Sequence, residues 1–127
     1  MNGLLLDSDV VIEVLRLRDP VIVAQWERLA VGDEPVFYTP VTSAEIWHGV
    51  RPGERASVEA LFSAMTCVPI DDAIGKRAGG YLQEFRRSHR LELGDTLIAA
   101  TATVHRLPLW TRNRRHYPMK DLVLWGP

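Results

Sequence analysis

The chain contains few of the residues that several common protein classes require. It holds a single cysteine, Cys67, so it cannot form an internal disulfide or a thiol-rich zinc site. Because Cys67 lies in an apolar run, we expect it to be a small buried residue. No stretch approaches the roughly 18 apolar residues of a spanning helix, and the start has no basic, apolar leader. We therefore expect no membrane association and a cytoplasmic location.

The sequence also lacks an excess of positive charge. Its net charge of -1 argues against a protein that coats nucleic acid. Only Lys76 and Lys120 are lysines, and three arginines stand close together at Arg112, Arg114 and Arg115. Guanidinium groups bind phosphate in bidentate fashion, which makes these three candidate contacts to a nucleic-acid backbone. The alternative for each is an ordinary solvated face.

Apolar residues make up 46% of the chain, and their pattern alternates between strands and helices. Apolar runs predict strands at 3–6, 36–39, 66–70 and 107–111, with a possible last strand at 121–125. Helical periodicity and end signals predict helices at 8–16, 20–30, 42–50, 54–64, about 71–89, and 95–106. This order predicts one domain over residues 1–127. We expect a three-layer α/β/α sandwich with a central, mainly parallel sheet of four to five strands.

Three carboxylates stand where strands end or helices begin. Asp7 follows the first predicted strand, and Glu45 and Asp95 lie at the starts of later helices. In an open parallel sheet, ligands bind at the carboxyl ends of the strands, so these residues and the segment 111–116 are expected to share one site. Hard oxygen ligands favour Mg²⁺ or Mn²⁺ over zinc. The sequence thus predicts a divalent-metal site.

Each carboxylate also has a structural interpretation. Asp7 and Asp95 are plausible N-caps, and Glu45 follows Thr42 at the spacing of a capping box. Capping and metal ligation are compatible, because a carboxylate at a helix start also points out of the sheet edge. It is the co-occurrence of the three residues that favours a metal site over three separate helix caps.

Four segments carry a family resemblance: LLDSDVVI at 5–12, SAEIWHG at 43–49, GDTLIAATA at 94–102 and WTRNRRHY at 110–117. In this order they resemble the PIN-domain family, specifically the VapC-type toxins of bacterial toxin–antitoxin pairs. The resemblance implies a PIN-like fold and an endoribonuclease. In it, Asp7, Glu45 and Asp95 would bind one or two Mg²⁺ ions, with Mn²⁺ as a possible substitute.

The resemblance extends to supporting residues and partners. It implies that Ser8 and Asn113 support the site by hydrogen bonding, with Thr111 in the same segment. It also implies a VapB-like antitoxin that blocks the site, a homodimer, and an RNA substrate such as a tRNA or rRNA loop. Water would attack the phosphodiester, which leaves 5′-phosphate and 3′-hydroxyl ends.

One position departs from the family pattern. Similar proteins commonly carry a fourth acid where this chain has His116. A neutral imidazole does not replace that charge, so we expect weaker metal binding, with Asp9 or Glu92 as partial compensation. A catalytically weak or inactive PIN-like binding module is therefore the main alternative function.

A haloacid-dehalogenase-type phosphatase is a second alternative. Asp7, Ser8 and Asp9 fit its D-x-D nucleophile motif after an apolar strand. However, that family's later motif needs an aspartate four residues after the first, and Ala99 stands at that distance from Asp95. The nuclease interpretation is therefore favoured.

Overall fold

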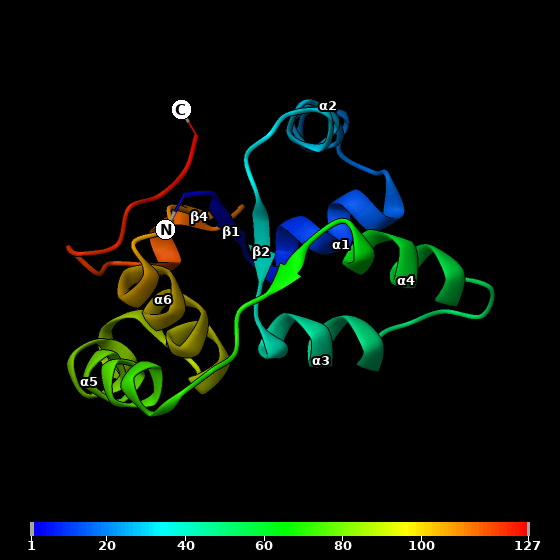
Figure 1. The fold of residues 1–127 in the computed structure, drawn as a ribbon. Helices are drawn as coiled ribbons and strands as arrows, with labels where there is room; N and C mark the ends of the chain where they lie inside the picture. The colour runs from blue at the N-terminus through cyan, green and yellow to red at the C-terminus, as the bar shows by residue number, and fades with distance from the viewer. Residues whose placement is uncertain (1, 127) are drawn as a thin grey trace.

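The computed structural model describes residues 2–126 as a parallel sheet with helices on both faces (Figure 1). The strands lie in the order β3-β2-β1-β4, and every neighbouring pair is parallel. They are β1 (Leu4–Leu6), β2 (Val36–Tyr38), β3 (Thr66–Cys67) and β4 (Leu109–Trp110). The helices are α1 (Ser8–Arg16), α2 (Pro20–Val31), α3 (Pro40–His48), α4 (Arg55–Ser63), α5 (Asp72–His89) and α6 (Leu93–His105), followed by a 3₁₀ turn, η1 (Arg114–His116).

The three leucines of β1 divide the core into two layers. Leu5 packs in the cluster formed with α5 and α6, whereas Leu4 and Leu6 pack in the cluster formed with α1 to α4. Successive side chains of a strand point to opposite faces, so a central strand buried on both faces has an uninterrupted apolar sequence. Figure 1 shows α5 and α6 on one side of the sheet and α1 and α4 on the other. The predicted α/β/α sandwich is confirmed.

Several predicted boundaries were wrong. The helix expected at 42–50 begins two residues earlier, because Pro40 occupies its first turn and the Thr39 hydroxyl caps it by accepting from Val41 N. The predicted capping box between Thr42 and Glu45 therefore does not form. The helix expected at 95–106 begins at Leu93, which makes Asp95 its third residue rather than its cap.

The predicted strands also differ from the observed ones. The strand expected at 107–111 is limited to Leu109–Trp110. Within the described residues, the segment expected as a last strand contributes a single bridge between Leu109 and Leu124. Cys67, predicted to be buried, is exposed, because β3 is the edge strand of the sheet formed by the described residues. In residues 2–126, no helix is long and apolar enough to cross a bilayer.

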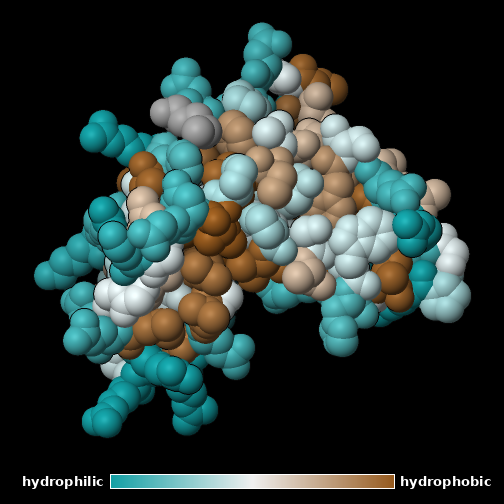
Figure 2. Space-filling model, turned by 60° about the horizontal axis from the view of Figure 1, so that its bottom comes forward, coloured by the Kyte–Doolittle hydropathy of each residue, from teal (hydrophilic) through white to brown (hydrophobic). Residues whose placement is uncertain are grey.

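The carboxyl ends of β1, β2 and β4 lead directly into α1, α3 and the segment before η1. In Figure 1 this edge of the sheet faces downward, toward α3 and the lower end of α6. Figure 2 brings it forward and shows a surface indented between the part built by α5 and α6 and the part built by α3 and α4, with hydrophobic residues along one side of the indentation and hydrophilic residues farther out. Parallel sheets bind their ligands at this edge.

Candidate active site

Asp7 is the most enclosed carboxylate at this edge, with 7% of its surface exposed. Its Oδ1 accepts from the backbone N–H of Ser8 at 2.8 Å, which caps α1. Its Oδ2 accepts from the hydroxyls of Thr111 at 2.9 Å and Tyr117 at 2.7 Å. Burial raises the pKa of Asp7 above its ordinary value, the hydrogen bonds oppose this, and the charge of Asp95 raises it further. Asp7 therefore caps α1, and its ionised form is disfavoured by burial and by the charge of Asp95.

Glu45 lies in the interior of α3. Its Oε1 accepts from the Ser8 hydroxyl at 3.0 Å, and Ser8 Oγ lies 2.9 Å from Thr42 Oγ1. Burial raises the pKa of Glu45, the Ser8 bond lowers it, and the charges of Asp7 and Asp95 raise it again. Because Ser8 is adjacent to Asp7 and bonded to Glu45, it links two of the predicted ligands.

Asp95 lies in the first turn of α6, where it forms a capping box with Glu92. Its Oδ2 accepts from the Glu92 backbone N–H at 3.1 Å. The same oxygen lies 3.0 Å from His116 Nε2, in the geometry of a donating imidazole N–H. His116 thus contacts a predicted ligand directly at the position of the family's fourth acid.

The segment 111–117 joins the site to the end of β4. Thr111 is buried and donates to Asp7, and its Oγ1 accepts from the backbone N–H of Asn113 at 3.1 Å. Asn113 thus contacts the site residue Thr111 through its main chain, and its supporting role stays a prediction. Tyr117 was missed in the sequence analysis, because a buried tyrosine near the chain end gives no signal that its hydroxyl contacts a residue 110 positions away.

Asp9 belongs to the same edge. Its carboxylate accepts from the Arg112 backbone N–H at 3.1 and 3.3 Å and from the Thr111 hydroxyl at 3.4 Å. Burial, followed by the charge of Asp7, raises its pKa to about 6. Asp9 therefore adds negative charge beside Asp7 but is already engaged by the 111–117 segment.

The three predicted phosphate-binding arginines have different surroundings. The Arg112 guanidinium bonds to Glu13 at 2.9 Å, and Arg114 donates to the carbonyl of Trp125 at 3.1 Å. Arg115 is exposed and has no ion pair within residues 2–126. All three side chains are exposed, and within residues 2–126 Arg115 alone has a guanidinium with no hydrogen bond or ion pair to the protein.

The donor set suits a hard divalent cation. Asp7, Glu45 and Asp95 supply oxygens from three elements. The charge of Asp95 raises the pKa of Asp7, and the charges of Asp7 and Asp95 raise that of Glu45. Among the described residues, no lysine or arginine pairs with Asp7 or Glu45. Within the same residues, no three histidine, cysteine, aspartate or glutamate side chains converge closely enough to enclose an ion unaided. The three carboxylates remain the predicted ligands.

Removing the Tyr117 hydroxyl tests how Asp7 is held. In Tyr117→Phe, Asp7 Oδ2 keeps only Thr111 as its donor, so the free energy of unfolding should fall by about 1.5–3 kcal/mol, as for a lost bond to a charged group. Urea denaturation at neutral pH measures the change. Tyr38→Phe is the matched control, and an equal loss in both variants would contradict a specific role for the Tyr117 hydroxyl.

Comparison with known proteins supports the arrangement. Residues 4–122 match the PIN domain family model. The chain belongs to the PIN-domain family. Ribonuclease VapC10 of Mycobacterium tuberculosis is 42% identical over 117 residues, which cover 91% of this chain and 86% of that protein. This membership favours the nuclease interpretation over the phosphatase alternative.

Solved structures share the PIN fold. A toxin–antitoxin complex from Klebsiella pneumoniae contains a chain that is 25% identical with a TM-score of 0.74, covering 95% of this chain and 96% of that one. A second chain comes from VapBC2 of Rickettsia felis, crystallised with a promoter DNA fragment. It has a TM-score of 0.82 at 16% identity, with coverage of 95% and 96%. At that identity, the second likeness concerns the fold alone.

Proposed function

We propose that this PIN-domain protein is the toxin of a VapBC-type pair, a metal-dependent endoribonuclease that cuts RNA to 5′-phosphate and 3′-hydroxyl ends. One observation carries the proposal. Asp7, Glu45 and Asp95 come from three separate elements at the carboxyl edge of the sheet, Ser8 links the first two, and the charges of Asp7 and Asp95 raise the pKa of Glu45. The 42% identity to a protein named as a ribonuclease supports the substrate class.

Mg²⁺, with Mn²⁺ as a substitute, is the proposed cofactor, as one or two ions held by the three carboxylates. A bound divalent ion acidifies water and neutralises charge on the phosphoryl oxygens. The protein's own part is to keep these oxygens in place. Thr111 and Tyr117 fix Asp7, and Ser8 fixes Glu45. His116 restrains Asp95 and takes the position of the missing fourth acid.

The RNA backbone is bound by an exposed arginine of the 111–117 segment. Arg115 offers an unpaired guanidinium within the described residues and is the proposed phosphate contact. Because no protein nucleophile is involved and water attacks, the ribose 2′-hydroxyl takes no part, so a cyclic phosphate is not formed. A single-stranded loop of tRNA or rRNA is the proposed substrate, since unstacked bases can be read there.

A VapB-like antitoxin is the proposed partner, and the toxin is proposed to act in the cytoplasm as a homodimer. The Klebsiella complex, at 25% identity, is described as a toxin–antitoxin pair. We propose that the antitoxin of this chain covers the acidic edge and withholds it from RNA.

Incubation with RNA tests the proposal. We expect the antitoxin-free protein to produce discrete cuts in total bacterial RNA with Mg²⁺ or Mn²⁺ and none in EDTA. Mapping of the new ends should give 5′-phosphates, and Asp95→Asn, which keeps the shape of the side chain, should be inactive. Cuts that persist in EDTA or end in cyclic phosphates would overturn the metal mechanism.

The inactive binding module is the second candidate, because His116 removes one acid from the family pattern. It predicts that folded protein binds the antitoxin but cleaves no RNA with either ion. That result would replace the nuclease proposal.

A further inference from the structure

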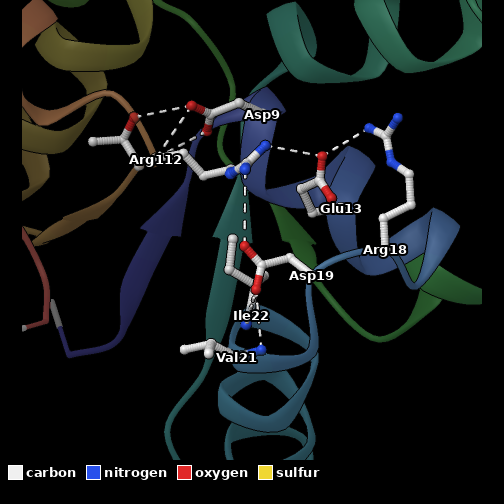
Figure 3. Close-up of polar contacts among 8 residues, drawn as sticks. Asp9, Glu13, Arg18, Asp19, Val21, Ile22 and Arg112 are labelled. Atoms are coloured by element: carbon white, nitrogen blue, oxygen red, sulfur yellow. Dashed lines mark hydrogen bonds and ion pairs between the residues drawn. The ribbon is translucent and has the colours of Figure 1, made fainter.

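Glu13 is a buried carboxylate that the proposed chemistry does not use. It lies on α1 with 4% of its surface exposed. Its Oε1 accepts from Arg112 Nη1 at 2.9 Å and from Arg18 Nη2 at 2.7 Å (Figure 3). A buried charge is strongly unfavourable unless it is paired, and two guanidinium groups meet that requirement here.

Arg112 is held both through its guanidinium and through its backbone N–H. Besides Glu13, its guanidinium lies 3.8 Å from Asp19 Oδ2, while Asp19 Oδ1 caps α2. Its backbone N–H donates to both oxygens of Asp9. Figure 3 shows the side chain directed between α1 and the start of α2. Arg112 thus joins the end of the last strand to two helices from the first part of the chain.

Arg112 lies in the segment whose side chains contact two of the predicted metal ligands. The preceding residue, Thr111, donates to Asp7, and the segment continues to His116 and Tyr117, which contact Asp95 and Asp7. The orientation of the segment therefore sets the donors around two predicted metal ligands. A shift of the backbone at Arg112 would move these donors together.

We infer that Arg112 is a positioning residue: its guanidinium, held by Glu13 and Asp19, fixes the segment 111–117 against the acidic site instead of binding RNA. For its effect on cleavage, this inference rests on the proposed nuclease function. It is an alternative to the expectation that Arg112 is a phosphate contact, and it leaves that role to Arg115.

Kinetics of paired arginine variants separate the two roles. Arg112→Gln should lower kcat at least about tenfold with little change in KM, because misplaced catalytic groups slow the chemical step. Arg112→Lys keeps one charge near Glu13 and should recover part of the rate. Arg115→Gln should raise KM with kcat near that of the parent. A rise in KM without a fall in kcat for Arg112→Gln would overturn the inference.

A double-mutant comparison tests the partner. If Glu13 acts through Arg112, the variant carrying Glu13→Gln and Arg112→Gln together should be no slower than the worse single variant. Multiplied effects would show that the two residues act independently and would contradict the inference.

A spectroscopic measurement tests positioning without any activity. The chain has three tyrosines, so fluorotyrosine labelling gives three fluorine NMR signals, assigned with tyrosine-to-phenylalanine variants. Arg112→Gln should move the Tyr117 signal and leave those of Tyr38 and Tyr81 in place. Arg28→Gln, on the surface of α2, should move none of them.

This readout separates the inference from the proposed function. If the parent protein cleaves no RNA, the proposed function fails, yet a displaced Tyr117 signal still supports the positioning role. An unmoved Tyr117 signal in folded Arg112→Gln would refute that role whatever the activity. If Arg112→Gln does not fold, Arg112→Lys is measured in its place; it should move the Tyr117 signal, and an unmoved signal would refute the role.

Discussion

Replacing Asp7 by asparagine is expected to abolish RNA cleavage and, at the same time, to raise the Tm of the metal-free protein. The rate should fall at least about a hundredfold, because the variant loses a charged ligand of the proposed ion. The Tm should rise because a buried charge that burial and Asp95 disfavour is removed. Asparagine keeps the side-chain oxygen that accepts from Ser8 N, so the cap of α1 survives.

The gain in stability should depend on pH. The folded protein raises the pKa of Asp7 above 3.8 and that of Asp9 from 3.8 to about 6. Above pH 3.8 the folded state therefore binds more protons than the unfolded state, and stability is lost as the pH rises through the folded values. In Asp7→Asn this contribution disappears for residue 7 and shrinks for Asp9. The difference in Tm should therefore grow from pH 4 upward.

Thermal unfolding in EDTA at several pH values between about 4 and 8 measures this dependence. Asp33→Asn is the matched control, because Asp33 is exposed, and it should show neither the loss of cleavage nor the gain in Tm. A lower Tm for Asp7→Asn at neutral pH would contradict the account of Asp7 as an unfavourable buried charge. Retained cleavage would remove Asp7 from the active site.

The position of Asp7 could be predicted because local rules determine it. A short apolar run predicts a buried parallel strand, the residue after it lies at the carboxyl edge, and an aspartate there caps the next helix. The same reasoning brought Glu45 and Asp95 to one edge, although it placed the helix starts two residues late. For α3 the error came from Pro40, whose preference for a first turn outweighed the spacing of Thr42 and Glu45. For α6 it came from taking Asp95 as the N-cap, a position that Glu92 occupies.

The surroundings of the carboxylates could not be predicted from the sequence. Tyr117 bonds to Asp7 across 110 residues, and Arg112 bonds to Glu13 across 99. Nothing local marks these pairs, because each depends on how the last strand lies beside the first. Arg112 shows the consequence: its residue type suggested a phosphate contact, whereas the fold gives it two acidic partners.

The His116→Asp variant is expected to bind Mn²⁺ more tightly and to be less stable without it. The change places an acid where the resemblance to VapC-type PIN domains predicts one, directly beside Asp95. A further carboxylate adds charge and an oxygen donor to the site, and the Kd for Mn²⁺ should fall roughly tenfold. In EDTA the two neighbouring carboxylates repel each other, so the Tm should fall below that of the parent.

Calorimetric titration with Mn²⁺ and thermal unfolding with and without the ion measure both effects. His116→Asn is the control, because it removes the imidazole contact to Asp95 but adds no charge, and it should bind Mn²⁺ no more tightly than the parent. The increase in Tm on adding Mn²⁺ should be largest for His116→Asp, since a ligand that binds more tightly stabilises the folded state more at the same concentration. Equal Mn²⁺ affinity in the parent and His116→Asp would mean that residue 116 lies outside the reach of the ion. His116 would then act only on Asp95, through the 3.0 Å contact between its Nε2 and the carboxylate.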